Sequence, residues 1–310
     1  MAAPRRHTFP LVPRHRLTGG TFGAYHSLRR GSGTDIAGSR HYVPGDQLAW
    51  IDWKTSARNS AAQHDDAFVV REHYADEAPR VVIVADHHPS MALYPSGLPW
   101  LAKATVLRHV IVAIAAAAHA ARAYVGYLDF SGASGRAGAA YWVPPRRVSV
   151  RQIEQRLTTP FDAPADVLQR GIDELHIRRH DASAGCFVFV VSDFLRPPPV
   201  QTWLRAHGRR WDLVPVIIQD PVWEQSFPAV GGALIPVADP ATGRTTGIRL
   251  SAREAERLRD EHAARLESLI RLFHGLDFDP VVLGTSEEHE VDLAFLNWAN
   301  RRRFQRRRAA

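Results

Sequence analysis

Cysteine and lysine are almost absent from this sequence of 310 residues. The single cysteine, Cys186, lies inside the apolar run CFVFVV and has no partner for an intramolecular disulfide. We therefore expect it to be a small core residue, and we expect a cytoplasmic location. Lys54 and Lys103 are the only lysines among the 39 basic residues. Such a preference for arginine is typical of a composition bias and does not by itself indicate phosphate recognition.

A long uninterrupted apolar run is missing as well. The N-terminal stretch MAAPRRHTFPLVPRHR is basic but lacks the ~7–15 apolar residues that follow in a secretory signal, so we expect no export by that route. The most apolar segment, residues 104–121, is interrupted by Arg108, His109 and His119 and is shorter than the ~20 apolar residues of a spanning helix. We expect this segment to be a buried helix that covers a sheet, with no membrane span.

The positive charge is confined to one place. The formal net charge is +7, and the last ten residues, RRRFQRRRAA, contain six arginines, so the rest of the chain is nearly neutral. The tail could bind nucleic acid by counterion release, but we expect a solvated helix end. In that helix Leu293, Leu296 and Trp298 should pack on the domain while the arginines face water.

Motifs of nucleotide and hydrolase chemistry are missing from the place where they would be expected. The run VVIVAD (81–86) is followed by HHPSM, without the glycine-rich turn of a dinucleotide-binding fold or a P-loop. No GxSxG elbow occurs, and His87, His88 and Ser90 form no recognisable ordered triad. The histidines also lack the i, i+4 spacing of a helical zinc motif, so we expect them to be solvated or hydrogen-bonded.

Apolar strands that alternate with helices dominate the chain after residue 80. Continuous apolar runs separated by helical segments indicate a doubly wound, mainly parallel α/β sheet with helices on both faces. We predict domains at 1–80, an irregular segment packed on the main domain, and 81–310. Residues 68–76 could add a strand or an extended arm. The expected strands are 81–86, 123–130, 140–144, 186–194 and 211–220, and the expected helices are 104–121, 150–157, 165–179 and 199–208.

Two of these strands end in an aspartate, Asp86 and Asp193. Ligands of such folds bind outside the carboxyl ends of the strands, so we predict parallel neighbouring strands that place both carboxylates at one edge of the sheet. Two carboxylates there suggest a site for a divalent cation, because Mg²⁺ prefers oxygen ligands.

The segment SRHYVPGDQLAWIDWKTSARN (39–59) is unusually rich in charged and aromatic residues. One interpretation is a structural knot, in which PGD closes a turn, Asp52 caps or pairs locally, and Tyr42, Trp50 and Trp53 pack the segment. The other is an exposed docking surface whose charges steer a partner. The charged residues of that surface would be Arg40, Asp46, Asp52, Lys54 and Arg58.

Three motifs together resemble a known family. SGTDIAGSRHYVPGDQLAWIDWKTSAR, VVREHYADE and VVIVADHHPSM resemble the signature of the domain-of-unknown-function 58 family, and the likeness extends to VSDF at 191–194. The resemblance implies a von Willebrand factor A-like domain with a metal-ion-dependent adhesion site on top of its sheet. It also implies a non-enzymatic protein-binding role beside a MoxR-type AAA+ ATPase.

The resemblance implies site residues too, with one departure. By position Asp86, Ser90 and Asp193 match the metal ligands of the family pattern, whereas His88 falls at a usual serine. The pattern's threonine has no secure counterpart here. Because imidazole presents nitrogen and is larger than a hydroxyl, it suits Mg²⁺ poorly. We therefore expect bound Mg²⁺ to be absent and the same face to bind protein without it.

The sequence therefore predicts a protein-interaction adaptor that works with a MoxR-type AAA+ ATPase and an unknown client protein. The alternative is a metal-dependent hydrolase or nuclease that uses Asp86 and Asp193, with the arginine tail holding nucleic acid. Catalytic carboxylates clustered around a metal pair would favour the enzyme, and an open strand-end face without them would favour the adaptor.

Overall fold

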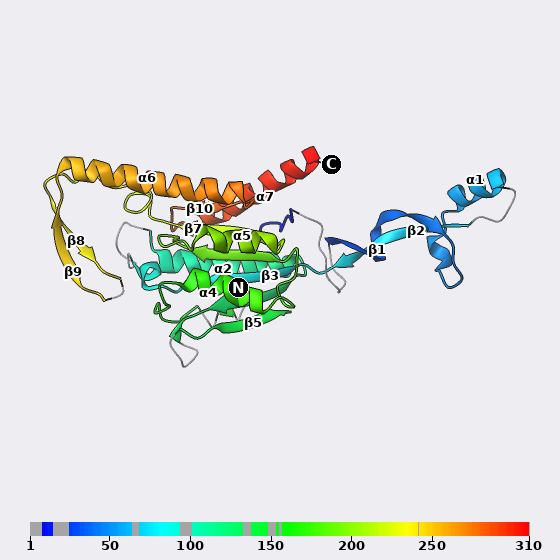
Figure 1. The fold of residues 1–310 in the computed structure, drawn as a ribbon, viewed down its shortest axis with the longest axis horizontal. Coiled ribbons are helices and arrows are strands. Elements are labelled where there is room, and N and C mark those ends of the chain that lie inside the picture. Colours follow the sequence, from blue (N-terminus) through cyan, green and yellow to red (C-terminus); the bar gives the residue numbers. More distant parts are fainter. Residues whose placement is uncertain are drawn as a thin grey trace, which may run out of the picture. The chain divides into compact units, whose positions relative to one another are not determined.

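The chain divides into two compact units, each described here by itself (Figure 1). The main unit comprises Met1–Arg14 and Arg80–Ala310, and the small unit comprises His15–Pro79. The computed structural model describes residues 8–14, 25–63, 68–93, 101–132, 138–147, 153–154, 157–240 and 242–309. The helix expected over 150–157 lies largely outside these residues.

In the described part of the chain, six strands form the central sheet of the main unit, in the order β10-β7-β6-β3-β4-β5. In that order they are β10 (Val281–Leu283), β7 (Asp212–Ile218), β6 (Phe187–Ser192), β3 (Arg80–Ala85), β4 (Tyr124–Asp129) and β5 (Tyr141–Arg146). The first five run parallel, and β5 pairs antiparallel with β4 at one edge. The predicted mainly parallel α/β sheet is confirmed.

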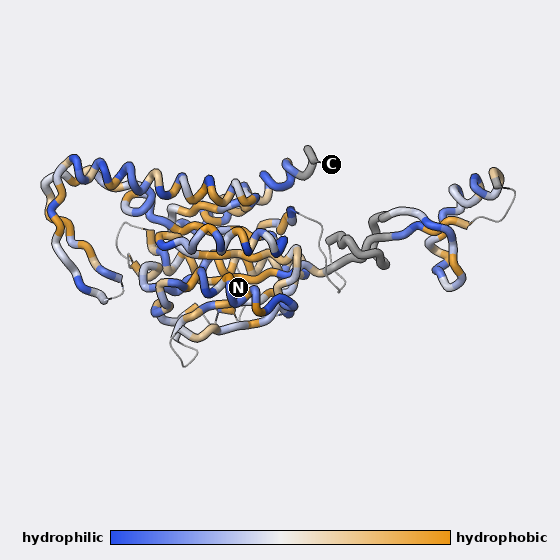
Figure 2. Tube along the Cα trace, viewed as in Figure 1, coloured by the Kyte–Doolittle hydropathy of each residue, from blue (hydrophilic) through white to orange (hydrophobic). Residues whose placement is uncertain are grey.

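Helices cover both faces of this sheet. On one face, α4 (Val167–Ile177), α5 (Val200–Gly208) and α6 (Ala252–Gly275) share a hydrophobic core with alternate residues of β3, β6 and β7. On the other face lie α2 (Lys103–Ala120) and α7 (Glu288–Ala309), where the Trp298 ring lies 6.0 Å from the ring of Phe189. Because both faces are covered, the strands are apolar throughout, as Figure 2 shows for the centre of the main unit.

Helix α2 is the apolar helix expected over 104–121. Its length and hydropathy would also suit a membrane span, and 56% of it is buried inside the protein. The expectation that the chain has no membrane span stays a prediction.

The C-terminal helix α7 differs in detail from the prediction. Its buried face is formed by Val291, Phe295, Trp298, Ala299 and Arg302, which recur at helical spacing. Trp298 packs as predicted, but Leu293 and Leu296 are only half-buried. The prediction that the arginines face water is wrong for Arg302, which is 1% exposed.

Arg302 is buried because it closes an ion-pair network with the first residues of the chain. Its guanidinium contacts Asp212 at 2.8 Å and Asp279 at 2.7 Å. Arg14 pairs with the same Asp279 carboxylate at 2.6 Å, and Phe9 stacks on Phe295. Residues 8–14 therefore pack within the main unit.

The small unit is more regular than the irregular segment expected for it. A long strand, β1 (Tyr25–His41), pairs antiparallel with β2 (Val69–Glu77), with several register shifts. Between them lie a short 3-10 turn, η1 (Leu48–Trp50), and α1 (Trp53–Gln63). The strand suggested for residues 68–76 is confirmed. The packing of this segment on the main domain stays a prediction.

Three short features of the main unit were not predicted from the sequence. One is strand β10, at an edge of the central sheet. A 3-10 turn, η2 (Pro89–Ala92), follows β3, and a two-stranded hairpin of β8 (Leu234–Ala238) and β9 (Thr245–Arg249) precedes α6. The turn η2 shapes the candidate site.

Candidate functional site

The candidate site lies where the strand order of the main sheet reverses. Strands β3 and β6 are parallel neighbours, and the chain proceeds from β3 toward one edge of the sheet and from β6 toward the other. Such a switch point is the usual ligand site of a doubly wound sheet. Asp86 and Asp193 follow these two strands, so the prediction that they share one sheet edge is confirmed.

Asp86 is held by the neighbouring strand end and by its own loop. The Ser192 hydroxyl donates to Oδ2 at 2.6 Å, and the His88 N–H donates to Oδ1 at 2.7 Å. The side chain is almost completely buried. Burial, reinforced by the nearby Asp193 carboxylate, raises the pKa of Asp86 to about 7.

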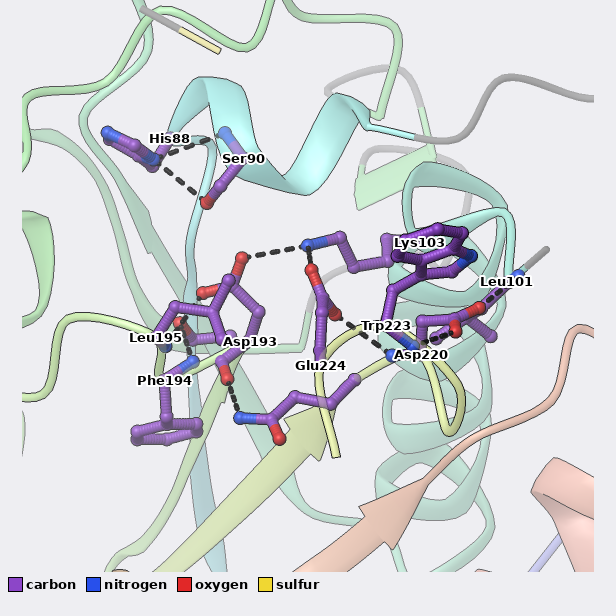
Figure 3. Close-up of polar contacts among 12 residues, drawn as sticks. His88, Ser90, Leu101, Lys103, Asp193, Phe194, Leu195, Asp220, Trp223 and Glu224 are labelled. Atoms are coloured by element: carbon purple, nitrogen blue, oxygen red, sulfur yellow. Dashed lines mark hydrogen bonds and ion pairs between the residues drawn. The ribbon is translucent and has the colours of Figure 1, made fainter. Parts of the chain in front are cut away.

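His88 and Ser90 bond to one another across η2. The Ser90 N–H donates to Nδ1 of His88 at 3.1 Å, and the Ser90 hydroxyl lies 2.9 Å from the same nitrogen (Figure 3). Because a backbone N–H can only donate, Nδ1 accepts this hydrogen bond and carries no proton. The imidazole is therefore neutral. Burial lowers the pKa of His88, and the positive charges of Arg196 and Lys103 act in the same direction.

A buried lysine that the sequence analysis missed holds the other strand end. Lys103, the first residue of α2, is 0% exposed. Its ammonium contacts Asp193 Oδ2 at 3.0 Å and Glu224 Oε1 at 2.6 Å, as Figure 3 shows. The available signal was compositional, because this is one of only two lysines and it stands beside the most apolar segment of the chain.

Further hydrogen bonds fix the carboxylates around this ammonium. The second Glu224 oxygen accepts from the Asp220 N–H at 2.9 Å, and Asp220 in turn accepts from the Leu101 N–H at 3.0 Å, just before α2 (Figure 3). Gln219 donates to the Asp193 carbonyl at 2.5 Å. Burial raises the pKa of Glu224, although the contact with Lys103 opposes that shift.

These contacts do not fit a hydrated Mg²⁺ at the positions implied by the family pattern. The Lys103 ammonium lies on Asp193, and the Ser90 hydroxyl faces His88. A cation is thus already supplied by the protein, and a second one beside it would be repelled. Within the described ranges, no group of three or more His, Cys, Asp or Glu side chains is placed to hold a metal ion. The metal-ligand roles of Asp86, Ser90 and Asp193 stay a prediction that this geometry does not support.

The buried hydroxyl of Thr159 is used in another contact beside the site. Its hydroxyl contacts Nδ1 of His87 at 3.0 Å, and the other ring nitrogen of His87 contacts the Tyr127 hydroxyl at 3.2 Å. His87 is 1% exposed. This chain of contacts lies in the core beside the site.

A pocket of about 190 Å³ opens above the strand ends. Asp86, His88, Ser90 and Asp193 form its polar side, and Arg196, which is exposed, also lines it. The remaining side is mainly apolar and is formed by Leu93, Ala165, Val167, Leu168, Leu195 and Pro240, with Ser192 beneath. The pocket therefore combines a hydrogen-bonded polar side, an apolar side and an exposed arginine.

The charged residues of segment 39–59 lie in the small unit, and the structure separates them into two groups. Arg40 forms a bidentate pair with Asp46, both contacts at 2.6 Å. Together with the Val43 N–H, this pairing holds the pKa of Asp46 at about 2. Asp52 caps α1 by accepting from the Thr55 N–H at 3.1 Å. These three charged residues hold the local fold.

Lys54 and Arg58 form the second group. Both are exposed on α1, and no ion pair or hydrogen bond of their side chains is found within the described residues. The structural interpretation therefore holds for Arg40, Asp46 and Asp52, and the docking role of the segment stays a prediction.

The family model described as "Protein of unknown function DUF58" matches residues 38–268. The chain belongs to the DUF58 family. In this DUF58 protein the matched region runs from β1 into α6 and so contains both segment 39–59 and the strand-end pocket.

The similar proteins add no function to the family assignment. The chain is 29% identical over 254 residues to uncharacterized proteins of Mycobacterium bovis and Mycobacterium tuberculosis, covering 80% of this chain and 74% of each relative. Among solved structures, the conserved hypothetical protein BatB of Bacteroides thetaiotaomicron aligns with a TM-score of 0.42 and 15% identity, over 72% of this chain and 100% of BatB. The pilus adhesin SpaC of Lactobacillus rhamnosus GG aligns with a TM-score of 0.43 and 12% identity, over 73% of this chain and 30% of the adhesin.

Proposed function

We propose that this DUF58 protein is a non-enzymatic adaptor that binds a MoxR-type AAA+ ATPase through the strand-end pocket of a von Willebrand factor A-like domain. The doubly wound sheet and the position of the pocket at the switch point support this proposal. The ATPase partner itself comes from the family resemblance.

The observation that carries the proposal is that the strand-end carboxylates are held by ion pairs and hydrogen bonds within the protein. Asp193 and Glu224 are paired with Lys103, and Asp86 accepts hydrogen bonds from Ser192 and His88. Groups used in this way are positioned to shape a rigid recognition surface. A partner would meet the apolar side and the exposed Arg196 rather than a reactive group.

A hydrolase or nuclease finds less support in the same geometry. Ser90 and His88 form a hydroxyl–imidazole pair, which is the first requirement of a nucleophilic site. Ser90 is nevertheless 8% exposed, and among the described residues no carboxylate hydrogen-bonds the other ring nitrogen of His88. Asp193 and Glu224 bind the Lys103 ammonium. In the proposed adaptor these carboxylates hold the strand ends together and do not bind a catalytic metal.

Calorimetric titration of the full chain with a MoxR-type ATPase encoded in the same genome tests the proposal. Replacing Asp86 by arginine would place a cation in a buried site and would test folding. The exposed Arg196→Glu variant is the sharper choice. We expect it to weaken binding at least tenfold, because reversal of a charge inside an interface adds repulsion.

Arg209→Glu is the matched control, since Arg209 is also exposed but precedes β7, at the opposite edge of the sheet. Its affinity should equal that of the wild type. Equal binding by both variants, or no binding by the wild type, would refute the proposed interface.

A further inference from the structure

We propose that the outward face of α1 in the small unit docks an acidic, amphipathic segment of a partner protein. This face is defined by Trp53, Lys54 and Arg58, with Phe68 beside it. The proposal is independent of the strand-end pocket and of the ATPase partnership, because it uses residues of the small unit alone.

The inner residues of segment 39–59 hold α1 against β2. Ile51 is buried and forms a bridge with Val70. The Asp52 N–H donates to the Val69 carbonyl at 2.8 Å, and the Val69 N–H donates to the buried Ser56 hydroxyl at 2.8 Å. Folding of the small unit thus accounts for these residues of the IDWKTSAR motif.

Folding does not account for the outer residues of the same motif. Trp53 is 63% exposed, and its ring lies edge-on to Phe68 with 6.1 Å between centroids. Phe68 is 38% exposed and contacts Tyr42 in the same way at 6.4 Å. The three rings support one another and leave a firm aromatic surface open to solvent. Exposed apolar clusters of this kind mark interaction sites, and tryptophan is enriched among residues that dominate binding energy.

Charge identifies the kind of partner. Lys54 and Arg58 are one turn apart, so they lie on the same side of α1. The neighbouring basic residues are already paired, Arg40 with Asp46 and Arg71 with Asp52. Helix α1 contains no acidic residue. Among the described residues the outward face is therefore positive beside its aromatic surface, and it complements a segment that presents carboxylates next to a large apolar side chain.

A protein segment fits this face better than a lipid surface does. Basic clusters that bind anionic membranes usually contain ~4–8 Lys or Arg residues, whereas α1 offers two. The single exposed tryptophan is an anchor suited to one apolar side chain of a partner.

Selection from a displayed library of random peptides on the full-length protein tests the inference. Enriched peptides should combine an excess of Asp and Glu with an aromatic or leucine anchor. The tightest of them, synthesised with a fluorescent label, should bind at least fivefold more weakly to Trp53→Ala and to the double variant Lys54→Gln/Arg58→Gln. A version of the same peptide with its acidic residues changed to lysine should lose at least tenfold.

Matched controls separate the site from general surface effects. Phe304→Ala removes another exposed aromatic, and Arg249→Gln/Arg253→Gln removes two other exposed cations. Both should bind the peptide like the wild type, and circular dichroism should show all variants folded.

Four results would overturn the inference. Peptides that bind Trp53→Ala as tightly as the wild type, or that carry no acidic excess, would do so. Light scattering that shows a dimer lost on Trp53→Ala would assign the face to a second copy of the chain. Cosedimentation with phosphatidylserine vesicles that is abolished by Lys54→Gln/Arg58→Gln would assign it to a membrane.

Discussion

Replacing Lys103 by methionine is the most informative perturbation of the strand-end site. Methionine keeps much of the length of the side chain but removes the ammonium that joins Asp193 and Glu224. These carboxylates are only 5% and 6% exposed, so water cannot replace the lost cation. Breaking a buried ion pair by removing one partner costs about 3–5 kcal/mol. That is a large share of the ~5–15 kcal/mol that separates folded from unfolded domains.

The loss should depend on pH with a definite sign. Without the ammonium, the folded-state pKa of Glu224, already raised by burial, should rise further above its unfolded value. A raised folded-state pKa contributes stability that is present below the unfolded pKa and is lost as pH rises through the folded pKa. The deficit of Lys103→Met should therefore be smallest in acid, near the ordinary pKa of a glutamate, and grow toward neutral pH.

Urea unfolding across that pH range measures both effects. A matched variant, Lys103→Met combined with Asp193→Asn and Glu224→Gln, removes the charges together. Removing the charges together leaves no unpaired buried charge, and the amide oxygens can still accept from the Leu195 and Asp220 N–H groups, so this variant should recover part of the lost stability. A cost for Lys103→Met below about 1 kcal/mol, or one that does not change with pH, would refute the structural role assigned to the ammonium.

Three further predictions concern single side chains. Asp86→Asn should flatten the fall in stability between about pH 4 and pH 7, because a pKa raised to about 7 makes the ionised carboxylate cost roughly 4 kcal/mol at most; an unchanged pH profile in urea titrations would show that Asp86 is not the group responsible. Arg302→Met should lower the free energy of unfolding by about 3–5 kcal/mol. Deletion of residues 305–310 should change it by less than about 0.5 kcal/mol. Thermal melts in which the deletion is the more destabilising change would contradict the ion-pair assignment. Ser56→Ala should cost about 1–3 kcal/mol, because it leaves the buried Val69 N–H without its acceptor, and loss of hydrogen-exchange protection at that amide should accompany it.

The sequence predicted the parts of the fold that depend on local pattern. CFVFVVSD and VVIVAD are apolar at every position before their terminal polar residues, which is why their pairing and the shared edge of Asp86 and Asp193 could be predicted. The prediction of an irregular N-terminal segment failed because β1 is held by backbone pairing and shows no alternating side-chain pattern. RRGSGTD reads as a turn, yet it belongs to β1, which tolerates it through register shifts against β2.

The interactions that define the candidate site could not be predicted from the local sequence pattern. Lys103 lies 90 residues from Asp193 and 121 from Glu224, and nothing near it in the sequence indicates that it points into the strand ends. Arg302 was assigned to solvent for the same reason, because Asp212 lies 90 residues away. A basic residue in an otherwise basic tail carries no local sign of burial.

The dependence of partner binding on magnesium tests the central claim most directly. Titration calorimetry of the full chain with the MoxR-type ATPase, first with Mg²⁺ and then with a chelator, compares the two conditions; any nucleotide bound to the ATPase must be held constant. Because Lys103 already supplies the cation at the strand ends, we predict the same affinity in both. Binding that disappears with the chelator and returns with Mg²⁺ would contradict the account and restore a metal-dependent adhesion site.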